Sequence, residues 1–181
     1  MMKGLDKYPE EYFLKYKEKP VNIKPYNSSQ TSVAMRYIKL LRHILKSTNA
    51  TFMVRGSTLF KIQGKGDVEV GIYTRESEWE TVLKKLEKRF SKPENLEENY
   101  ARFNDVQDGT EVEIIVLKGH EASVDIKLHK YLLKHKNLLA EYENIKKEYS
   151  FSKREYQRQK SRFLSKVILA IPEDDKLDNS S

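Results

Sequence analysis

The segment at residues 67–73 constrains the fold most, because its apolar residues alternate with a period of two. Val68 and Val70 fall on one side of this segment, and Asp67 and Glu69 fall on the other. Period two is the pattern of a β-strand with one buried face. Acidic residues are depleted in strands because they gain little from a half-buried pleated surface. We therefore predict a strand whose polar face carries a pair of carboxylates that needs a separate explanation.

Two further segments predict strands, and amphipathic segments between them predict helices. Residues 52–54 form a short apolar run, and residues 111–117 alternate again. A polar loop is expected between residues 93 and 110. Capping boxes of Ser with Glu three residues later are expected to open two helices. The expected helices cover 31–46, 78–90 (with Ser77 and Glu80), several segments after Gly119, and a last helix (with Ser152 and Glu155) that ends before Pro172.

This order of elements predicts an α+β fold, with a small mixed β-sheet, helices packed on one face and a helical C-terminal part. We expect an N-terminal arm at residues 1–20, one domain at 21–170 and a disordered tail at 171–181. The chain has 181 residues, which is enough to bury a core. No stretch approaches the roughly 20 apolar residues that span a bilayer, so no membrane association is expected.

The composition narrows the possible partners. The chain lacks cysteine, which excludes disulfides and thiolate metal sites. With no recognisable secretory signal, we expect a cytoplasmic protein. The formal net charge of +7 favours anionic partners such as nucleotides or nucleic acid. Most lysines are accompanied by acids, a pattern that predicts solvated helix faces. Residues 152–163 concentrate cations without matching acids, so RNA binding by this helix is an alternative.

The carboxylates on the predicted strands are candidate metal ligands. Asp67 and Glu69 are two residues apart, so they share a face at a spacing of about 6–7 Å. Mg²⁺ usually takes one or two carboxylates plus substrate phosphates. Glu113 lies on the polar face of residues 111–117 and could complete a two-metal site. Asp125 could compete with Glu113 but is better explained as a helix N-cap or first-turn acid. The alternative for the whole set is a solvated sheet face.

A glycine and a hydroxyl precede the acid pair. Gly56 and Ser57 follow the strand at 52–54, and such a turn brings backbone N–H groups and a hydroxyl close to a phosphate, although an ordinary turn would use the same residues. Tyr156 and Lys160 are one turn apart on the last helix, where they could meet a triphosphate or base, or form a solvated pair.

The chain resembles the signature of the nucleotidyltransferase superfamily in a run of four elements: a strand, Gly-Ser, a nine-residue spacer and Asp-Val-Glu-Val. More of the chain, about residues 21–170, resembles its GrpB branch. Besides Gly-Ser-Thr at 56–58, the quoted matches are the opening segment at 21–26, Gly-Lys-Gly at 64–66, and positions in the helical end: residues 131–135, 141–142, 145–146, Tyr156, Lys160 and Phe163.

The resemblance implies a Mg²⁺-dependent nucleotidyltransferase that transfers a nucleoside monophosphate from a nucleoside triphosphate to a hydroxyl acceptor. Its implied catalytic and metal residues are Asp67, Glu69 and Glu113, and its implied nucleotide-binding residues are Gly56, Ser57, Lys65, Tyr156 and Lys160. The chain departs from the GrpB pattern where the usual His-x-His aligns with Glu-Val-Glu at 111–113, which moves it toward three carboxylates. The alternative is a catalytically inactive accessory module that binds a protein partner or handles a coenzyme, since some GrpB members are fused to dephospho-CoA kinase.

Overall fold

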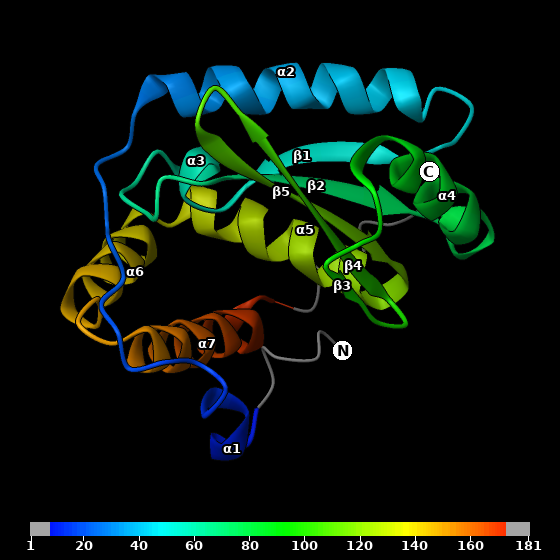
Figure 1. Cartoon of the computed structure of the whole chain (residues 1–181). Coiled ribbons are helices and arrows are strands. Elements are labelled where there is room, and N and C mark those ends of the chain that lie inside the picture. The colour runs from blue at the N-terminus through cyan, green and yellow to red at the C-terminus, as the bar shows by residue number, and fades with distance from the viewer. Residues whose placement is uncertain (1–7, 173–181) are drawn as a thin grey trace. The chain divides into compact units, whose positions relative to one another are not determined.

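A five-stranded mixed sheet organises residues 25–123 (Figure 1). The computed structural model describes residues 8–172, and these divide into two units. One unit is the sheet with its helices at residues 25–123, and the other is helical and combines residues 8–24 with residues 124–172. The mixed α+β architecture predicted from the sequence is confirmed.

The parallel pairing of two strands is the central feature of the sheet. Its order is β1-β2-β5-β4-β3. Strands β2 and β5 run parallel, and the other neighbouring pairs are antiparallel. The predicted strands at 52–54, 67–73 and 111–117 are confirmed with slightly shifted ends. The strands are β1 (Thr51–Arg55), β2 (Val68–Thr74), β3 (Asn95–Leu96), β4 (Tyr100–Gln107) and β5 (Thr110–Lys118).

Two amphipathic helices pack on the valine face of this sheet. They are α2 (Ser28–Ile44) and α4 (Trp79–Phe90), which lie close to the predicted ranges. Their apolar stripes join the inward residues of β2, β4 and β5 in one buried cluster. Helix α2 begins before the predicted start because Asn27 and Gln30 form a capping box. The Asn27 side chain accepts from the Ser29 N–H at 2.9 Å, and the Gln30 side chain accepts from the Asn27 N–H at 3.0 Å.

The expected polar loop between residues 93 and 110 is wrong, because most of this segment forms β3 and β4. Ala101 and Phe103 are fully buried on the core face of β4. Their pattern is weak in the sequence, since an alanine carries little hydrophobic signal. In addition, Val106 further along the strand is exposed. The alternation of apolar residues therefore did not reveal the pairing of β4 with β3 and β5.

The two predicted capping boxes have different outcomes. Ser77 lies inside a 3₁₀ turn, η1 (Glu76–Glu78), and does not cap α4, whose N-cap residue Glu78 makes no capping hydrogen bond. The Glu78 carboxylate instead accepts from the Asn49 N–H at 3.0 Å. Ser152 does cap its helix, because its hydroxyl accepts from the Glu155 N–H at 3.3 Å.

The helical unit combines residues from both ends of the chain. The N-terminal segment is bound to it by backbone hydrogen bonds, from the Val21 N–H to the Ser150 carbonyl and from the Lys153 N–H to the Lys19 carbonyl, both at 2.7 Å. Residues 1–7 of the expected arm, and residues 173–181 of the expected tail, lie outside the described residues. Over residues 8–172, no helix has the length and apolar character needed to cross a membrane. The helices are α1 (Glu10–Phe13), α5 (Gly119–Lys134), which crosses the boundary between the units, α6 (Lys136–Glu148) and α7 (Lys153–Ala170).

Replacement of Ile114 by alanine should test the packing of the valine face. Ile114 is fully buried and lies between Val70 of β2 and Phe103 of β4 in the sheet register. The cavity left by Ile114→Ala should cost about 2–5 kcal/mol of unfolding free energy. Val106→Ala, at a position that is 65% exposed on β4, should change it by less than about 0.5 kcal/mol. Urea denaturation of both variants measures the difference, and equal costs would contradict the assigned face.

Candidate functional site

Three carboxylates from β2, β5 and the turn before β2 meet on the face of the sheet opposite the valines. Glu69 and Glu113 are register partners across the parallel pair, and Asp67 directly precedes β2. One oxygen of each of the three side chains lies within 4.8 Å of the others. The acids that the strand periodicity placed on one face therefore do come together, which is the donor set that a hard divalent cation prefers.

The buried position of Asp67 fits a cation site. Its side chain is 5% exposed, compared with 19% for Glu69 and 21% for Glu113. The Oδ2 atom of Asp67 is buried and forms an ion pair with the Lys65 ammonium at 2.5 Å. An ionised carboxylate is costly to bury unless a positive charge offsets it. A divalent cation ligated by Asp67 Oδ2 and the two glutamates would supply such a charge in place of Lys65.

Basic side chains also lie against this carboxylate cluster. The Lys65 ammonium is 2.5 Å from Asp67 Oδ2 and 3.7 Å from Glu113 Oε1. The Arg55 guanidinium is 3.6 Å from Glu69 Oε2. Lys65 was expected to be a nucleotide-binding residue, and that role stays a prediction, while the structure shows its ammonium paired with Asp67 and Glu113. Arg55 was missed, although its position directly before Gly-Ser is a signal that could have indicated it.

The electrostatic environment shifts two pKa values. Burial raises the pKa of Glu113, and the nearby charge of Glu69 raises it further, while Lys65 and Arg102 partly oppose the shift. Burial by itself lowers the pKa of Lys65, but the charges of Asp67 and Glu113 outweigh burial and raise it above its usual value. Lys65 is therefore a stable cation at neutral pH. Arg102 was also missed, because it lies on β4, where no strand was expected.

The Gly-Ser turn lies directly beside this cluster. Gly56 opens the short helix α3 (Gly56–Phe60) with a φ of +58°. A Cβ at this position would lie 2.8 Å from Glu69 Oε1, so only glycine fits here without a shift. Ser57 is nearly buried at 8% exposure. The next hydroxyl, Thr58 Oγ1, is buried without a hydrogen bond among the described residues, so the turn also has unused hydrogen-bonding capacity.

Other predicted residues belong to the helical unit. Tyr156 is 2% exposed and packs inside that unit, so the alternative of a solvated pair with Lys160 is wrong for Tyr156. Lys160 is partly exposed. Their nucleotide-binding role stays a prediction. Asp125 is also a correction, because it is fully buried inside α5, beyond the first turn.

The cations of α7 are largely paired with acids, which the sequence pattern did not reveal. Glu10, on α1, forms ion pairs with Arg158 and Arg162, while Arg154 pairs with Glu18. These acids come from the N-terminal segment, so the excess of charge seen along residues 152–163 is reduced by tertiary contacts. RNA binding by this helix stays a prediction.

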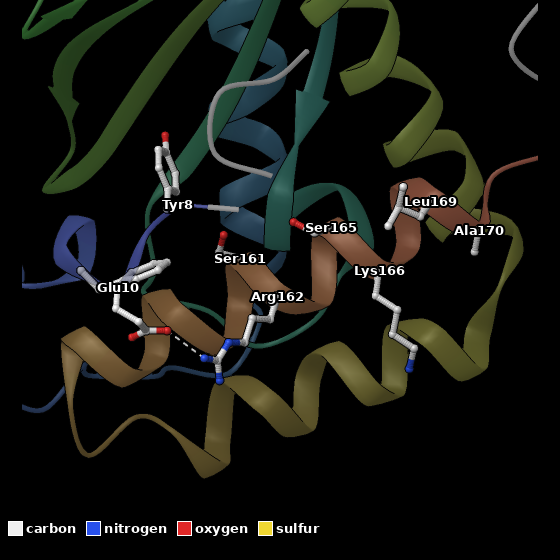
Figure 2. A pocket seen from close by; sticks show the side chains of 9 residues that line it. Tyr8, Glu10, Ser161, Arg162, Ser165, Lys166, Leu169 and Ala170 are labelled. Atoms are coloured by element: carbon white, nitrogen blue, oxygen red, sulfur yellow. Dashed lines mark hydrogen bonds and ion pairs between the residues drawn. The ribbon is translucent and has the colours of Figure 1, made fainter. Parts of the chain in front are cut away.

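A cavity of about 700 Å³ also lies in the helical unit, between the start of the described chain and α7 (Figure 2). Tyr8 and Leu169 contribute to its lining, and Figure 2 shows the ion pair of Glu10 with Arg162 at its side. The cavity includes none of the predicted site residues. Its lining is mostly apolar, which does not fit a triphosphate.

Comparisons with known proteins bear on the fold. No family model matches the chain, and no curated protein matches it in sequence. A chain from the structure of the GLD-2/RNP-8 complex matches with a TM-score of 0.55 at 12% identity, over 86% of this chain and 60% of that chain. The chain has a nucleotidyltransferase fold.

Two further structures match at lower TM-scores. Cid1 in complex with its short product ApU gives a TM-score of 0.47 at 12% identity, over 75% of this chain and 42% of that chain. The CdnE cyclic dinucleotide synthase of Elizabethkingia meningoseptica with GTP and Apcpp gives 0.47 at 8% identity, over 96% and 79%. The chain thus spans 42% of the matched Cid1 chain and 60% of the matched chain from the GLD-2/RNP-8 complex.

Replacement of Glu113 by glutamine should stabilise the protein at neutral pH. Because the pKa of Glu113 is raised in the folded state, its folded form holds a proton more tightly than the unfolded chain does. The contribution of the Glu113 carboxyl to the unfolding free energy is therefore fully present below its ordinary pKa of 4.5. This contribution is lost as the pH rises through the raised pKa of the folded state. Glu113→Gln should remove that loss and raise the melting temperature at pH 7 above that of the native protein.

The control for this variant is Glu111→Gln, an exposed acid on the same strand. Thermal melts from pH 4 to pH 8 without metal should show a gain for Glu113→Gln that disappears toward pH 4. A gain of equal size at every pH would contradict the assigned cause.

Replacement of Gly56 by alanine should disturb the turn and the acid cluster together. A positive φ costs about 1 kcal/mol for a non-glycine residue, and the new Cβ also forces Glu69 to move. We expect a loss of roughly 1–3 kcal/mol in urea denaturation. Gly109→Ala has a similar φ of +75° but open space around its Cβ, so it should show the conformational cost alone. A smaller loss for Gly56→Ala than for Gly109→Ala would contradict the close approach.

Proposed function

We propose that the protein is a metal-dependent nucleotidyltransferase, which transfers a nucleoside monophosphate from a nucleoside triphosphate to a hydroxyl acceptor. The observation that carries the proposal is the cluster of Asp67, Glu69 and Glu113 on a nucleotidyltransferase fold, beside a glycine turn. The assignment to the GrpB branch is part of the same proposal and rests on the sequence motifs alone.

The three carboxylates would hold Mg²⁺, with Asp67 as the most buried ligand. When bound, the cation would neutralise the triphosphate charge and make the acceptor hydroxyl more acidic. Glu69 on β2 and Asp67 directly before it would fix its position, while Glu113 would hold it from β5. Because β2 and β5 are neighbours in one sheet, these ligands are positioned by a rigid scaffold.

The phosphates would be held by the turn. The backbone N–H groups at Gly56 and Ser57, with the Ser57 hydroxyl, are donors suited to phosphate oxygens. In the reaction, the acceptor oxygen would bond to the α-phosphorus, the bond from the α-phosphorus to the bridging oxygen would break, and pyrophosphate would leave. Glu113 would help to take the hydroxyl proton from its position on β5.

A second candidate is the inactive accessory module, and one observation favours it. Lys65 lies within the carboxylate cluster, where a permanently bound ammonium would make a metal unnecessary. In that case the cluster would be a buried salt-bridge network that orders the start of β2. The two candidates differ in whether a divalent cation binds to the native protein in the presence of a nucleotide.

Replacement of Asp67 by asparagine should separate these two candidates. With Mg²⁺ and a panel of nucleoside triphosphates, Asp67→Asn should lower pyrophosphate release by about 100-fold or more, because it removes the most buried ligand. Asp108→Asn makes the same chemical change at a turn whose side chain is 76% exposed, and it should leave the rate unchanged.

Calorimetric titration with each nucleotide at millimolar Mg²⁺ provides the binding measurement. We expect binding to the native protein and to Asp108→Asn, and a much weaker response from Asp67→Asn. If the native protein binds no nucleotide under these conditions, the enzymatic proposal is wrong and the accessory role is favoured.

A further inference from the structure

The Lys65 ammonium occupies the space among the carboxylates in which a cation would be ligated. We propose that Lys65 competes with the divalent cation for Asp67 and Glu113 and is released only when phosphate groups accept it, so that cation and triphosphate bind cooperatively. This inference rests on the proposed function, because it describes how the same site would be loaded. It concerns the order and coupling of binding, which the proposed reaction leaves open.

The position of Lys65 is the first argument. Its Nζ atom is 2.5 Å from Asp67 Oδ2 and 3.7 Å from Glu113 Oε1, while all three carboxylates offer oxygens within 4.8 Å of one another. A cation shared by these oxygens would approach the same Oδ2 atom. Two positive charges at that spacing repel strongly in a partly buried site, so Lys65 and the cation compete for Asp67.

The charge balance of the site is the second argument. Glu69 is already paired with Arg55 at 3.6 Å, and Lys65 pairs with both remaining acids. Without a ligand, the cluster is therefore largely neutralised by the chain itself. A divalent cation that arrives alone must break the Lys65 contacts and gains less than it would from three unpaired carboxylates.

Lys65 has a route out of the site. Its side chain is 37% exposed, in contrast to the 5% of Asp67. It lies in the segment between α3 and β2, between Gly64 and Gly66, and Gly66 has a φ of +91°. Glycines on both sides give the backbone more conformational freedom than other residues would. The ammonium can therefore move toward solvent while Asp67 stays in place.

A triphosphate gives the released ammonium a new partner. Lysine is a strongly hydrated point charge with three donors, and it binds phosphate oxygens well. The turn at Gly56 and Ser57, which lies beside Glu69, would place phosphates next to the cluster. Displacement of Lys65 by the cation and capture of Lys65 by the phosphates would then support each other. By linkage, each ligand would raise the affinity of the other by the same factor.

The test compares Lys65→Met with the native protein, using Mn²⁺ as the cation probe and inorganic tripolyphosphate as the phosphate probe. Mn²⁺ binding alone is followed by electron paramagnetic resonance of the free ion. Lys65→Met should bind Mn²⁺ about tenfold more tightly than the native protein, within the usual range of such couplings. Calorimetry at saturating Mn²⁺ should show the opposite change for tripolyphosphate, which should bind about tenfold more weakly to Lys65→Met.

Two variants serve as controls. Lys61→Met removes an exposed lysine just after α3, and both affinities should stay at the native values. Lys65→Arg keeps the positive charge, so its Mn²⁺ affinity should stay closer to the native value than to that of Lys65→Met. Opposite changes in the two affinities cannot come from a general loss of structure, which would weaken both. Circular dichroism confirms that each variant is folded.

The outcomes separate this inference from the proposed function. If the native protein and Lys65→Met bind Mn²⁺ alone with equal affinity, the competition is wrong while the metal site stands. If neither protein binds Mn²⁺, with or without tripolyphosphate, both proposals are wrong. Tighter Mn²⁺ binding by Lys65→Met with unchanged tripolyphosphate affinity would overturn the coupling through phosphate.

Discussion

The parallel register of β2 with β5 is the constraint on which the site depends. Glu69 is the register partner of Glu113. The pairing that buries Val68 and Val70 on one face of the sheet therefore brings these two carboxylates together on the other face. At about 5 Å and an effective dielectric near 20, such a pair repels by about 3 kcal/mol. A slip of one residue would avoid this repulsion but would turn the valines away from α2 and α4. The packing of the core therefore enforces the electrostatic strain of the site.

Basic side chains offset that strain in different ways. Arg55 ends β1 and reaches Glu69, while Lys65 reaches Asp67 from the other end of the connection between β1 and β2. Gly71 helps Arg55, because a Cβ there would lie 2.7 Å from the Arg55 Cδ atom. The residual imbalance shows in the raised pKa of Glu113, which burial and the charge of Glu69 both favour. The positive and negative charges of the site therefore nearly offset one another, so that one added or removed cation changes its charge balance.

The parts of this structure that follow from local periodicity could be predicted. The alternation at 67–73 and 111–117 defines both strands and their faces, and the meeting of Asp67, Glu69 and Glu113 follows once those strands are neighbours. The strand at 100–107 was missed because its apolar signal is weak, although Asp108 and Gly109 form a two-residue hairpin turn that could have indicated its pairing with β5.

Contacts made by long flexible side chains could not be predicted either. Lys65 has three carboxylates within its reach as well as solvent, and the sequence alone does not decide among them. The charge on α7 shows the same limit, since the acids that pair with Arg154 and Arg162 are more than 100 residues away in the chain. The contacts at the tip of a long side chain depend on the tertiary structure. The face of the strand from which the side chain projects follows from the period-two alternation of the sequence alone.

One chain connection supplies most of the candidate site. From Arg55, the last residue of β1, to Glu69 on β2, the chain passes through the glycine turn, α3 and Lys65, so most of the residues proposed for the site come from this connection and the strand ends that flank it. Of the three carboxylates, only Glu113 comes from another part of the chain. The proposed coupling between cation and phosphate would therefore depend on one short segment of the chain, which carries both Lys65 and the glycine turn, while β5 positions Glu113 independently.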